Sequence, residues 1–348
     1  MNMRKIGGSF PEEPTLLNEN GYFEKICPPN GDLRFMMSGR CGIYYCLEDI
    51  LRTDQKKIAY VPRYTCETVL APFAKAGYQL RFYGIDRNMH SVFDPAALDE
   101  ISVLSLCGYF GFCNYDRGFV QACRERGIVI FEDVTHSLLS ASGIDPLCDY
   151  AAGSFRKWMG VSCGGFAMKR NGPFAAQPLP THRRHLELRQ ALMDVGPDVF
   201  WEGEMLLRQI FDSYEGDPRS EHIMRYADLE RICRQRRENY AALLAHLPAE
   251  TSGFHPVFPT LPEGVVPCNF TVYADEREHF QTYLADHGVR STAFWPLGPL
   301  VNLEGCPEEQ YIYDHVLSIP CDQRHDTEDM RYVAEVLAAY AAPSGGAM

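Results

Sequence analysis

The stretch from Ile128 to Gly165, IVIFEDVTHSLLSASGIDPLCDYAAGSFRKWMGVSCGG, indicates how this chain folds. It holds two short apolar runs, at 128–131 and 150–155, whose length and composition are typical of buried strands. The first run leads into Asp133 and the second into Lys157. Ligands of open α/β sheets bind at the carboxyl ends of the strands, so both charged residues are candidates for a binding site.

Short apolar runs of this kind alternate with helix-like segments throughout the first half of the chain. The other expected strands are Lys57–Val61, Gln79–Ile85, Ser102–Tyr109 and Gly165–Met168, and the expected helices are Cys41–Arg52, Thr65–Ala76 and Arg117–Arg126. Alternating strands and helices imply right-handed crossovers and a mostly parallel sheet that is covered on both faces. We therefore predict an α/β fold for this half.

The second half has a different organisation. From 175 to 219 and from 226 to 247 the sequence predicts polar helices with arginine clusters, which we interpret as solvated helix faces. The last third predicts a compact α+β domain, with strands at Val265–Tyr273, Thr292–Trp295 and Val316–Ile319 and helices at Glu276–His287 and Thr327–Ala341. The expected division is an N-terminal segment (1–35), a large domain (36–225) and a small C-terminal domain (226–348).

Composition excludes several classes of protein. The net charge of −13 argues against a nucleic-acid partner, because neutralising phosphates needs a concentrated basic surface. No apolar stretch has the length of a membrane span and the N-terminus lacks the apolar core of a signal peptide, so we expect no membrane partner and a cytoplasmic location. The 13 cysteines are an odd number without any CxxC pair, which predicts reduced thiols and neither a disulfide framework nor a zinc site.

The first feature with candidate chemistry is Ser38-Gly39-Arg40, which precedes an expected helix. A glycine turn that opens a helix presents free N–H groups and the positive end of the helix dipole, which suits a phosphate. Arg40 adds a charged donor to the turn. A tight turn that binds no ligand is the alternative explanation.

The second feature is Asp133, with His136 three residues later. A carboxylate at the end of a buried strand can keep a pyridinium nitrogen protonated, which makes the ring an effective electron sink. His136 could bond the same ring or its phenolic oxygen. Taken alone, Asp133 is also explained as a helix cap, and His136 as a core histidine.

The third feature is Gly153-Ser154-Phe155-Arg156-Lys157-Trp158, followed by Gly164-Gly165. A lysine directly after a buried strand is expected to be desolvated, which lowers the amine pKa and favours the nucleophile that forms a Schiff base. Ser154 could donate to a phosphate, and the glycine pair lets backbone pass close by. The alternatives are a surface lysine in a turn and the SxxK pattern of unrelated serine enzymes.

The order of the three features favours one cofactor. Pyridoxal 5′-phosphate (PLP) requires a phosphate anchor, a partner for its pyridinium nitrogen and a lysine for the Schiff base. Here these groups follow one another within one α/β domain. We therefore predict that PLP binds through Lys157.

In these segments the chain resembles the sugar-nucleotide aminotransferases of the DegT/StrS type, which have the PLP-dependent, aspartate aminotransferase-like fold. The likeness lies in Val61-Pro62-Arg63-Tyr64-Thr65, Ala76–Asp86, Glu132–His136 and Ser154–Lys157 with Gly164-Gly165. It covers most of residues 36–170 and extends loosely to the C-terminal domain. There, Phe294-Trp295-Pro296 is similar to the substrate-facing segment of the family.

The resemblance implies roles for the catalytic residues. Lys157 would form the internal aldimine and move the proton between the donor carbon and the cofactor. Asp133 would pair with the pyridinium nitrogen, and His136 would support the ring oxygen.

The resemblance also implies the binding residues. The phosphate would be held by Gly39, Arg40, Cys41 and Ser154. Trp295 would stack on a sugar or a base of the substrate, and filling the domain interface is the alternative for this residue.

The chain departs from the family pattern at four points. One is the spacing from Ser154 to Lys157, which is shorter than in most members and resembles a divergent branch associated with polysaccharide gene clusters. Cys66 stands where the family has the Phe or Trp that stacks on the cofactor ring. The stacking ring would then come from Tyr64, Tyr109 or Phe110. The Gly-Thr-Ala turn of the family is Gly39-Arg40-Cys41, and its Asn-Tyr-Arg motif, which crosses the dimer, has no counterpart between Glu202 and Arg237.

The implied enzyme is a homodimeric aminotransferase with its active site at the subunit interface. It would move an amino group from glutamate or glutamine to a nucleotide-linked keto sugar in polysaccharide biosynthesis. One alternative is elimination, decarboxylation or racemisation of an amino acid on the same fold, because the protein selects which bond breaks. The other is a non-catalytic member with a regulatory or scaffolding role.

Overall fold

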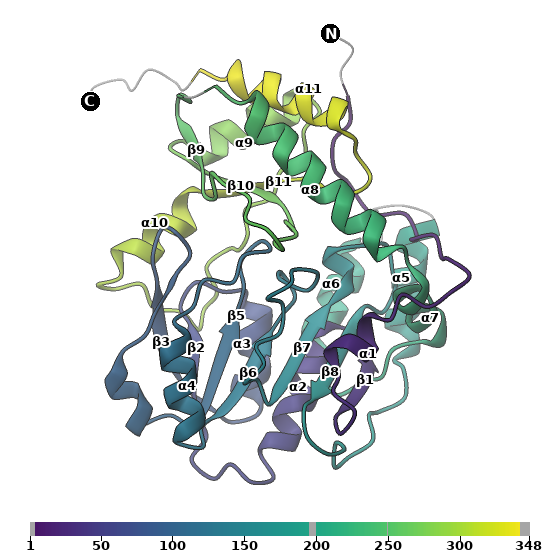
Figure 1. Ribbon diagram of the computed structural model, residues 1–348, viewed down its shortest axis with the longest axis vertical. Coiled ribbons are helices and arrows are strands. Elements are labelled where there is room, and N and C mark those ends of the chain that lie inside the picture. Colours follow the sequence, from purple (N-terminus) through teal and green to yellow (C-terminus); the bar gives the residue numbers. More distant parts are fainter. Residues whose placement is uncertain (1–3, 195–199, 249, 342–348) are drawn as a thin grey trace.

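The computed structural model describes residues 4–194, 200–248 and 250–341. It contains an eight-stranded sheet with the strand order β1-β8-β7-β6-β5-β2-β3-β4 and a three-stranded sheet with the order β11-β10-β9. Figure 1 shows the small sheet above the carboxyl edge of the large one. The predicted α/β class, with a mostly parallel large sheet, is confirmed.

The five central strands of the large sheet are parallel, and its edges are antiparallel. The strands are β1 (Asp32–Met36), β2 (Ile58–Pro62), β3 (Gln79–Ile85), β4 (Ser91–Val92), β5 (Val103–Cys107), β6 (Val129–Asp133), β7 (Tyr150–Ser154) and β8 (Gly165–Lys169). β1 is antiparallel to β8, which is antiparallel to β7. β1 therefore runs in the direction of β7, and both strands end at the same edge of the sheet.

Helices connect these strands and pack on them. They are α1 (Tyr22–Ile26), α2 (Gly39–Ile50), α3 (Glu67–Lys75), α4 (Arg117–Glu125), α5 (Arg183–Asp194), α6 (Phe200–Gln209) and α7 (Pro218–Tyr226). α2 packs on β7 and β8, and α4 packs on β6. At Gly42 the helix lies so close to the sheet that a Cβ would stand 2.4 Å from the Phe166 carbonyl oxygen. Only glycine allows this approach.

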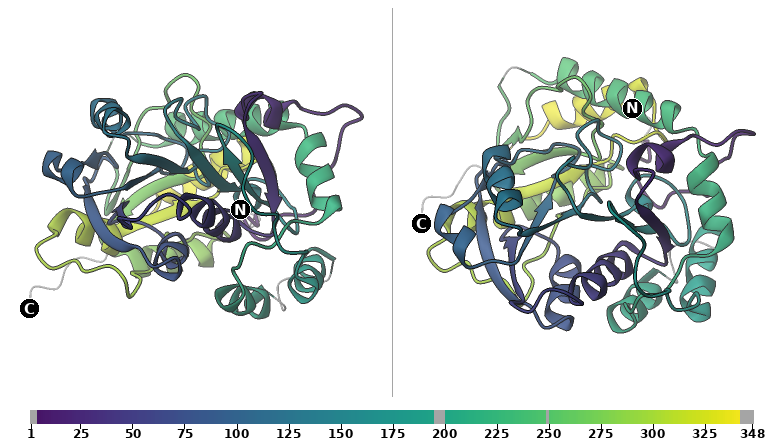
Figure 2. Two further views of the ribbon diagram at one scale, coloured as in Figure 1. Left: turned by 90° about the horizontal axis from the view of Figure 1, so that it is seen from below. Right: turned by 60° about the horizontal axis from the view of Figure 1, so that its bottom comes forward.

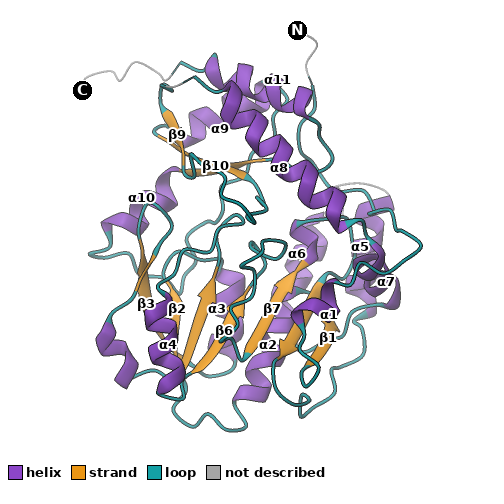
Figure 3. Ribbon diagram, viewed as in Figure 1, coloured by secondary structure: helices purple, strands orange, loops and turns teal. Residues whose placement is uncertain are grey.

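The small domain combines β9 (Phe254–Pro256), β10 (Phe270–Ala274) and β11 (Val316–Ile319) with four helices. The helices are α8 (Leu229–His246), α9 (Arg277–Asp286), α10 (Pro307–His315) and α11 (Thr327–Ala338). α8 and α11 pack against each other, and the right view of Figure 2 shows the green α8 and the yellow α11 together at the top of the molecule. Figure 3 shows the small sheet as a separate layer surrounded by these helices.

The N-terminal segment ties the two domains together. It forms single parallel bridges from Ile6 to Val289 in the small domain and from Glu12 to Gly160 in the large one. A Cβ on Gly160 would stand 1.6 Å from the Pro11 carbonyl oxygen, so the segment crosses directly over this glycine. The crossing lies three residues after Lys157.

Most of the predicted elements are present, and one predicted strand is wrong. The segment Thr292–Trp295 forms a single bridge, from Thr292 to Ser318, and then continues as a loop. The Phe294 carbonyl instead accepts from the Tyr64 hydroxyl and Trp295 packs on the Tyr64 ring, so the segment turns to the large domain and leaves the sheet. The short strands β1, β4 and β9 were not predicted.

The predicted domain limits remain a prediction, although β1 shows that the large sheet begins before residue 36. The predicted polar helices between 175 and 219 correspond to α5, α6 and α7, and residues 195–199 lie outside the described residues. Within the described ranges, no helix combines the length and hydropathy that crossing a bilayer requires.

Candidate active site

The carboxyl edge of the large sheet brings the predicted catalytic residues together. β6 ends at Asp133, and the neighbouring parallel strand β7 ends at Ser154. A short 3-10 turn, η2 (Phe155–Lys157), then carries Lys157 past this edge. The positive charge of Lys157 acts to lower the pKa of both Asp133 and His136, so the three side chains lie near one another.

The glycine turn before α2 lies against the end of β7. Ser38 caps the helix, since its Oγ accepts from the Cys41 N–H at 3.2 Å. The N–H groups of Gly39 and Arg40 then have no acceptor within the helix, as is usual in a first turn. A Cβ on Gly39 would stand 3.2 Å from the Cβ of Ser154. The helix N-terminus and Ser154 are therefore neighbours, as a phosphate anchor requires.

The side chains of Arg40 and Cys41 are engaged elsewhere. Arg40 Nη1 donates to the Leu207 carbonyl at 3.0 Å, and the guanidinium lies 5.2 Å from the centre of the Phe211 ring. The Cys41 thiol is fully buried, and burial raises its pKa to about 11. Arg40 can therefore serve an anchor through its backbone N–H, whereas Cys41 secures the helix cap.

Asp133 is buried, with one carboxylate oxygen occupied and the other open. Its Oδ1 accepts from the Thr135 N–H at 3.0 Å and from Thr135 Oγ1 at 2.6 Å. Among the described residues, no donor bonds Oδ2. Burial raises the pKa of Asp133 against the hydrogen bonds from Thr135 and the charge of Lys157. A further cationic donor would stabilise the carboxylate, and a protonated ring nitrogen is such a donor.

His136 is a buried, neutral histidine with an unsatisfied ring nitrogen. Burial, assisted by the charge of Lys157, lowers its pKa to about 3. Its Nδ1 is buried and has no hydrogen-bond partner in the described part of the chain. Because buried polar atoms are normally paired, this nitrogen marks a place for a ligand group. The Trp295 ring lies 4.9 Å away, between centres.

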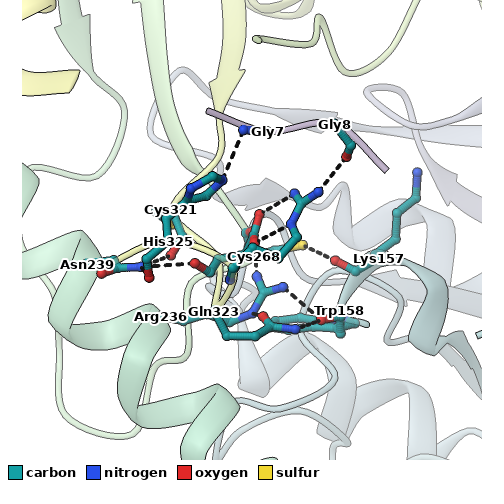
Figure 4. Close-up of polar contacts among 12 residues, drawn as sticks. Gly7, Gly8, Lys157, Trp158, Arg236, Asn239, Cys268, Cys321, Gln323 and His325 are labelled. Carbon is teal, nitrogen blue, oxygen red and sulfur yellow. Dashed lines mark hydrogen bonds and ion pairs between the residues drawn. The ribbon is translucent and has the colours of Figure 1, made fainter. Parts of the chain in front are cut away.

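The expectation that Lys157 is desolvated is wrong for the single chain, because its side chain is exposed. η2 leads the chain away from the sheet, and Figure 4 shows the amine extending away from Trp158 and Arg236. Nζ lies 4.9 Å from the centre of the Phe294 ring. Exposure leaves the amine accessible to a ligand.

The rings that were expected to stack on a cofactor form a closed cluster. Tyr64, Tyr109 and Phe110 are all buried. The Tyr64 hydroxyl donates to the Phe294 carbonyl, and its ring lies 5.3 Å from that of Trp295. Trp295 packs on all three buried rings and is itself partly exposed. A ligand can therefore reach Trp295 and Phe294 more readily than the predicted rings.

The contacts of two residues at this site were not predicted from the sequence. Thr135 orients Asp133, and a threonine two residues after an aspartate is a known local hydrogen-bonding pattern that could have indicated it. Phe294 lies beside the amine of Lys157. No local sequence pattern predicts this contact, because Phe294 belongs to a segment of the small domain. Cys66, where the family has a stacking ring, precedes α3 and accepts from Thr68 Oγ1 at 3.0 Å.

Glu132, next to Asp133, is a fully buried carboxyl that supports the same edge of the sheet. Its Oε1 accepts from the Tyr115 hydroxyl at 2.8 Å, and its Oε2 accepts from the Asp145 N–H at 2.6 Å. Burial raises the pKa of Glu132 from 4.5 to about 8, against these two hydrogen bonds. The folded protein therefore holds this proton at pH values where the unfolded chain has released it.

We expect this group to make the free energy of unfolding fall as pH rises from about 5 to 8, with a limiting slope of about 1.4 kcal/mol per pH unit. The stabilisation that Glu132 contributes is complete at pH values below its pKa in the unfolded chain. It is lost as pH rises through the pKa of Glu132 in the folded protein. Glu132→Gln removes the titration and should flatten this part of the profile. Urea unfolding of both proteins at pH 5, 6.5 and 8 measures the difference, and equal slopes would contradict the assignment.

Solved structures similar in fold to this chain include several aminotransferases. PseC of Helicobacter pylori, an aminotransferase involved in the biosynthesis of pseudoaminic acid, is 12% identical, with a TM-score of 0.69 over 96% of this chain and 98% of its own. The fold is that of the sugar aminotransferases. A DegT DnrJ EryC1 StrS aminotransferase from Brucella abortus is 14% identical, with a TM-score of 0.61 over 88% and 84% of the two chains.

A third similar structure is that of a PLP form. It is a protein of Streptococcus pneumoniae assigned to the sugar aminotransferases and solved in its PLP form, 14% identical with a TM-score of 0.62 over 96% and 98% of the two chains. At these identities the likeness establishes the fold, which confirms the fold that the DegT/StrS resemblance implied. No protein-family model matches the sequence, and no curated protein matches it.

Proposed function

We propose that this protein is a PLP-dependent aminotransferase. The observation that carries the proposal is a set of groups at one sheet edge that are unsatisfied within the described chain. They are Asp133 Oδ2, His136 Nδ1 and the first N–H groups of α2, and the accessible amine of Lys157 lies beside them. PLP fits these groups, because it offers a cationic ring nitrogen, a phenolic oxygen, a phosphate and an aldehyde.

Each residue would act on a different part of the cofactor. Lys157 would attach it covalently through Nζ, and Asp133 would keep the ring nitrogen protonated. His136 would bind the ring oxygen, and Gly39 and Ser154 would bind the phosphate. When bound, PLP supplies an electron sink for the carbon that bears the amino group. Lys157 would take the proton from that carbon and return it.

We further propose glutamate or glutamine as the amino donor and a nucleotide-linked keto sugar as the acceptor. The similar structures include PseC, involved in pseudoaminic acid biosynthesis, and the sugar aminotransferase CalS13 of Micromonospora echinospora. Trp295, partly exposed beside His136, offers a face on which a sugar or a base can stack. A cytoplasmic homodimer acting in polysaccharide biosynthesis is part of this proposal, and a partner subunit would also cover the exposed Lys157.

A half-reaction tests the proposed function. The purified protein is loaded with PLP, freed of excess cofactor, and treated with L-glutamate or L-glutamine in the absence of an acceptor. We expect a visible absorption band from the attached cofactor that disappears as about one equivalent of 2-oxo acid is released per site. The D-enantiomers of the two donors are the control.

Two other outcomes would support the alternatives. Binding of PLP without conversion by any amino donor would sink transamination and favour elimination, decarboxylation or racemisation, which the products of the amino acid alone would reveal. Failure to bind PLP would favour a non-catalytic role in regulation or scaffolding.

A further inference from the structure

The residue after Lys157 is held from three directions. Trp158 is fully buried, and its carbonyl accepts from Arg236 Nη2 at 3.0 Å and from Gln323 Nε2 at 2.7 Å. Its indole Nε1 donates to the Thr135 carbonyl at 2.8 Å. Figure 4 shows Arg236 and Gln323 meeting at this carbonyl. The backbone that carries Lys157 is therefore fastened to the small domain on one side and to the Asp133 loop on the other.

Arg236, on α8, is the centre of this fastening. Its guanidinium is fully buried and lies 4.8 Å from the centre of the Trp158 ring. Its Nε donates to Gln323 Oε1 at 2.9 Å, and its Nη1 donates to the carbonyls of Cys268 at 2.9 Å and Pro267 at 3.3 Å. Every one of these acceptors is a neutral oxygen.

A buried guanidinium without a carboxylate in direct contact is costly to maintain. Within the described residues, Arg236 is linked to the carboxylate of Glu13 indirectly, through Gln323. The Gln323 Nε2 lies 3.4 Å from Glu13 Oε2. The planar, five-donor group here binds two separate backbone segments and the Gln323 side chain at the same time, which a smaller or less forked side chain could not do.

The backbone carbonyls that Arg236 binds belong to residues next to the Lys157 peptide. Arg236 bonds the carbonyl of Trp158, directly after Lys157, and the carbonyl of Cys268, whose Sγ lies 3.9 Å from the Lys157 carbonyl oxygen. Trp158 in turn bonds Thr135, which bonds Asp133. A continuous series of contacts thus runs from Arg236 to the two groups that would hold PLP.

We propose that Arg236 is a positioning residue that fixes the turn of Lys157 relative to Asp133, so that both side chains reach one cofactor ring. This inference rests on the proposed function. Arg236 contacts neither the reacting atoms nor the phosphate anchor, and it acts through Trp158. Misplacing a reactive group by about 1 Å from a remote position can lower a rate about 10²-fold.

The test compares Arg236→Lys with Tyr240→Phe, which removes a hydrogen bond of 2.7 Å to the Phe258 carbonyl from the same buried face of α8. Hydrogen exchange of the amides of residues 155–160 is measured without cofactor, and the Kd for PLP is measured by titration. We expect Arg236→Lys to raise both the exchange rate of these amides and the Kd for PLP about tenfold or more. It should also lower kcat with little change in the KM for the donor. Tyr240→Phe should lower the melting temperature and leave these quantities unchanged.

Gln323→Leu removes the other donor to the Trp158 carbonyl and should act in the same direction, so the test holds even if Arg236→Lys fails to fold. If PLP binds the unaltered protein but exchange and Kd are unchanged in Arg236→Lys and Gln323→Leu, the role of Arg236 is contradicted and the proposed function is not. If the unaltered protein does not bind PLP, the proposed function is overturned and the inference with it.

Discussion

Replacing Lys157 with alanine is expected to abolish covalent attachment of PLP and to lower the rate of amino transfer at least about 10³-fold. The amine would serve both as the attachment point and as the group that moves the proton, so both functions are lost together. Folding should be preserved, because the side chain is exposed and surface substitutions usually change stability by less than about 0.5 kcal/mol. Spectra, turnover and thermal melting of the purified variant measure these three quantities.

Lys157→Arg is the matched control for charge. It keeps a cation of similar length, but a guanidinium stays protonated and is not a nucleophile at neutral pH. We expect it to be as inactive as Lys157→Ala, whereas a small amine added to the alanine variant should restore part of the proton transfer. A Lys157→Ala protein that retained covalently bound PLP after gel filtration would show that another lysine is the attachment point.

Asp133→Asn is expected to lower the rate of amino transfer by about 10²- to 10⁴-fold while stabilising the protein without cofactor. The amide keeps an oxygen for the two hydrogen bonds from Thr135, but its NH₂ group cannot hold a protonated ring nitrogen. Without that proton the ring withdraws electrons poorly. The cofactor-free protein should gain stability at pH 7, because burial raises the pKa of Asp133 and therefore disfavours the charged form.

These opposite effects distinguish a functional carboxylate from a structural one. The measurements are the half-reaction rate and urea unfolding of the cofactor-free protein at pH 7. Thr135→Val, which removes only the hydrogen bond of 2.6 Å from Oγ1, is the control and should lower the rate much less. An Asp133→Asn protein that lost stability and kept its rate would mean that Asp133 is a structural residue.

The sheet could be predicted from the sequence wherever a strand was apolar and long enough to be distinct. β3 has the predicted limits, and β6 and β7 differ from prediction by two residues or fewer. The edge strands β1 and β9 lacked that contrast, because only part of each is buried. Thr292–Trp295 has the composition of a strand, but the loop that follows it closes on the large domain rather than pairing in a sheet.

Some residues of the candidate site could likewise be predicted from the sequence, and others could not. Asp133, Ser154 and Lys157 could be assigned because each closes or directly follows an apolar strand, and parallel strands bring their carboxyl ends to one edge. The neighbours of these residues could not be assigned. Arg40 and Cys41 were predicted as phosphate ligands, but their side chains pack into the protein, which only the position of α2 against α6 and β8 decides.

By itself, then, the sequence determined the α/β sheet, the order of glycine turn, carboxylate and lysine, and the edge at which they meet, since these follow from local patterns and chain order. The tertiary structure decided that Lys157 is exposed, that Trp295 covers the buried tyrosines, and that Arg236 lies under Trp158. These features depend on contacts between segments remote in the sequence. No local period or composition encodes the positions of Trp295 and Arg236, because both depend on how the small domain packs over the edge of the large sheet.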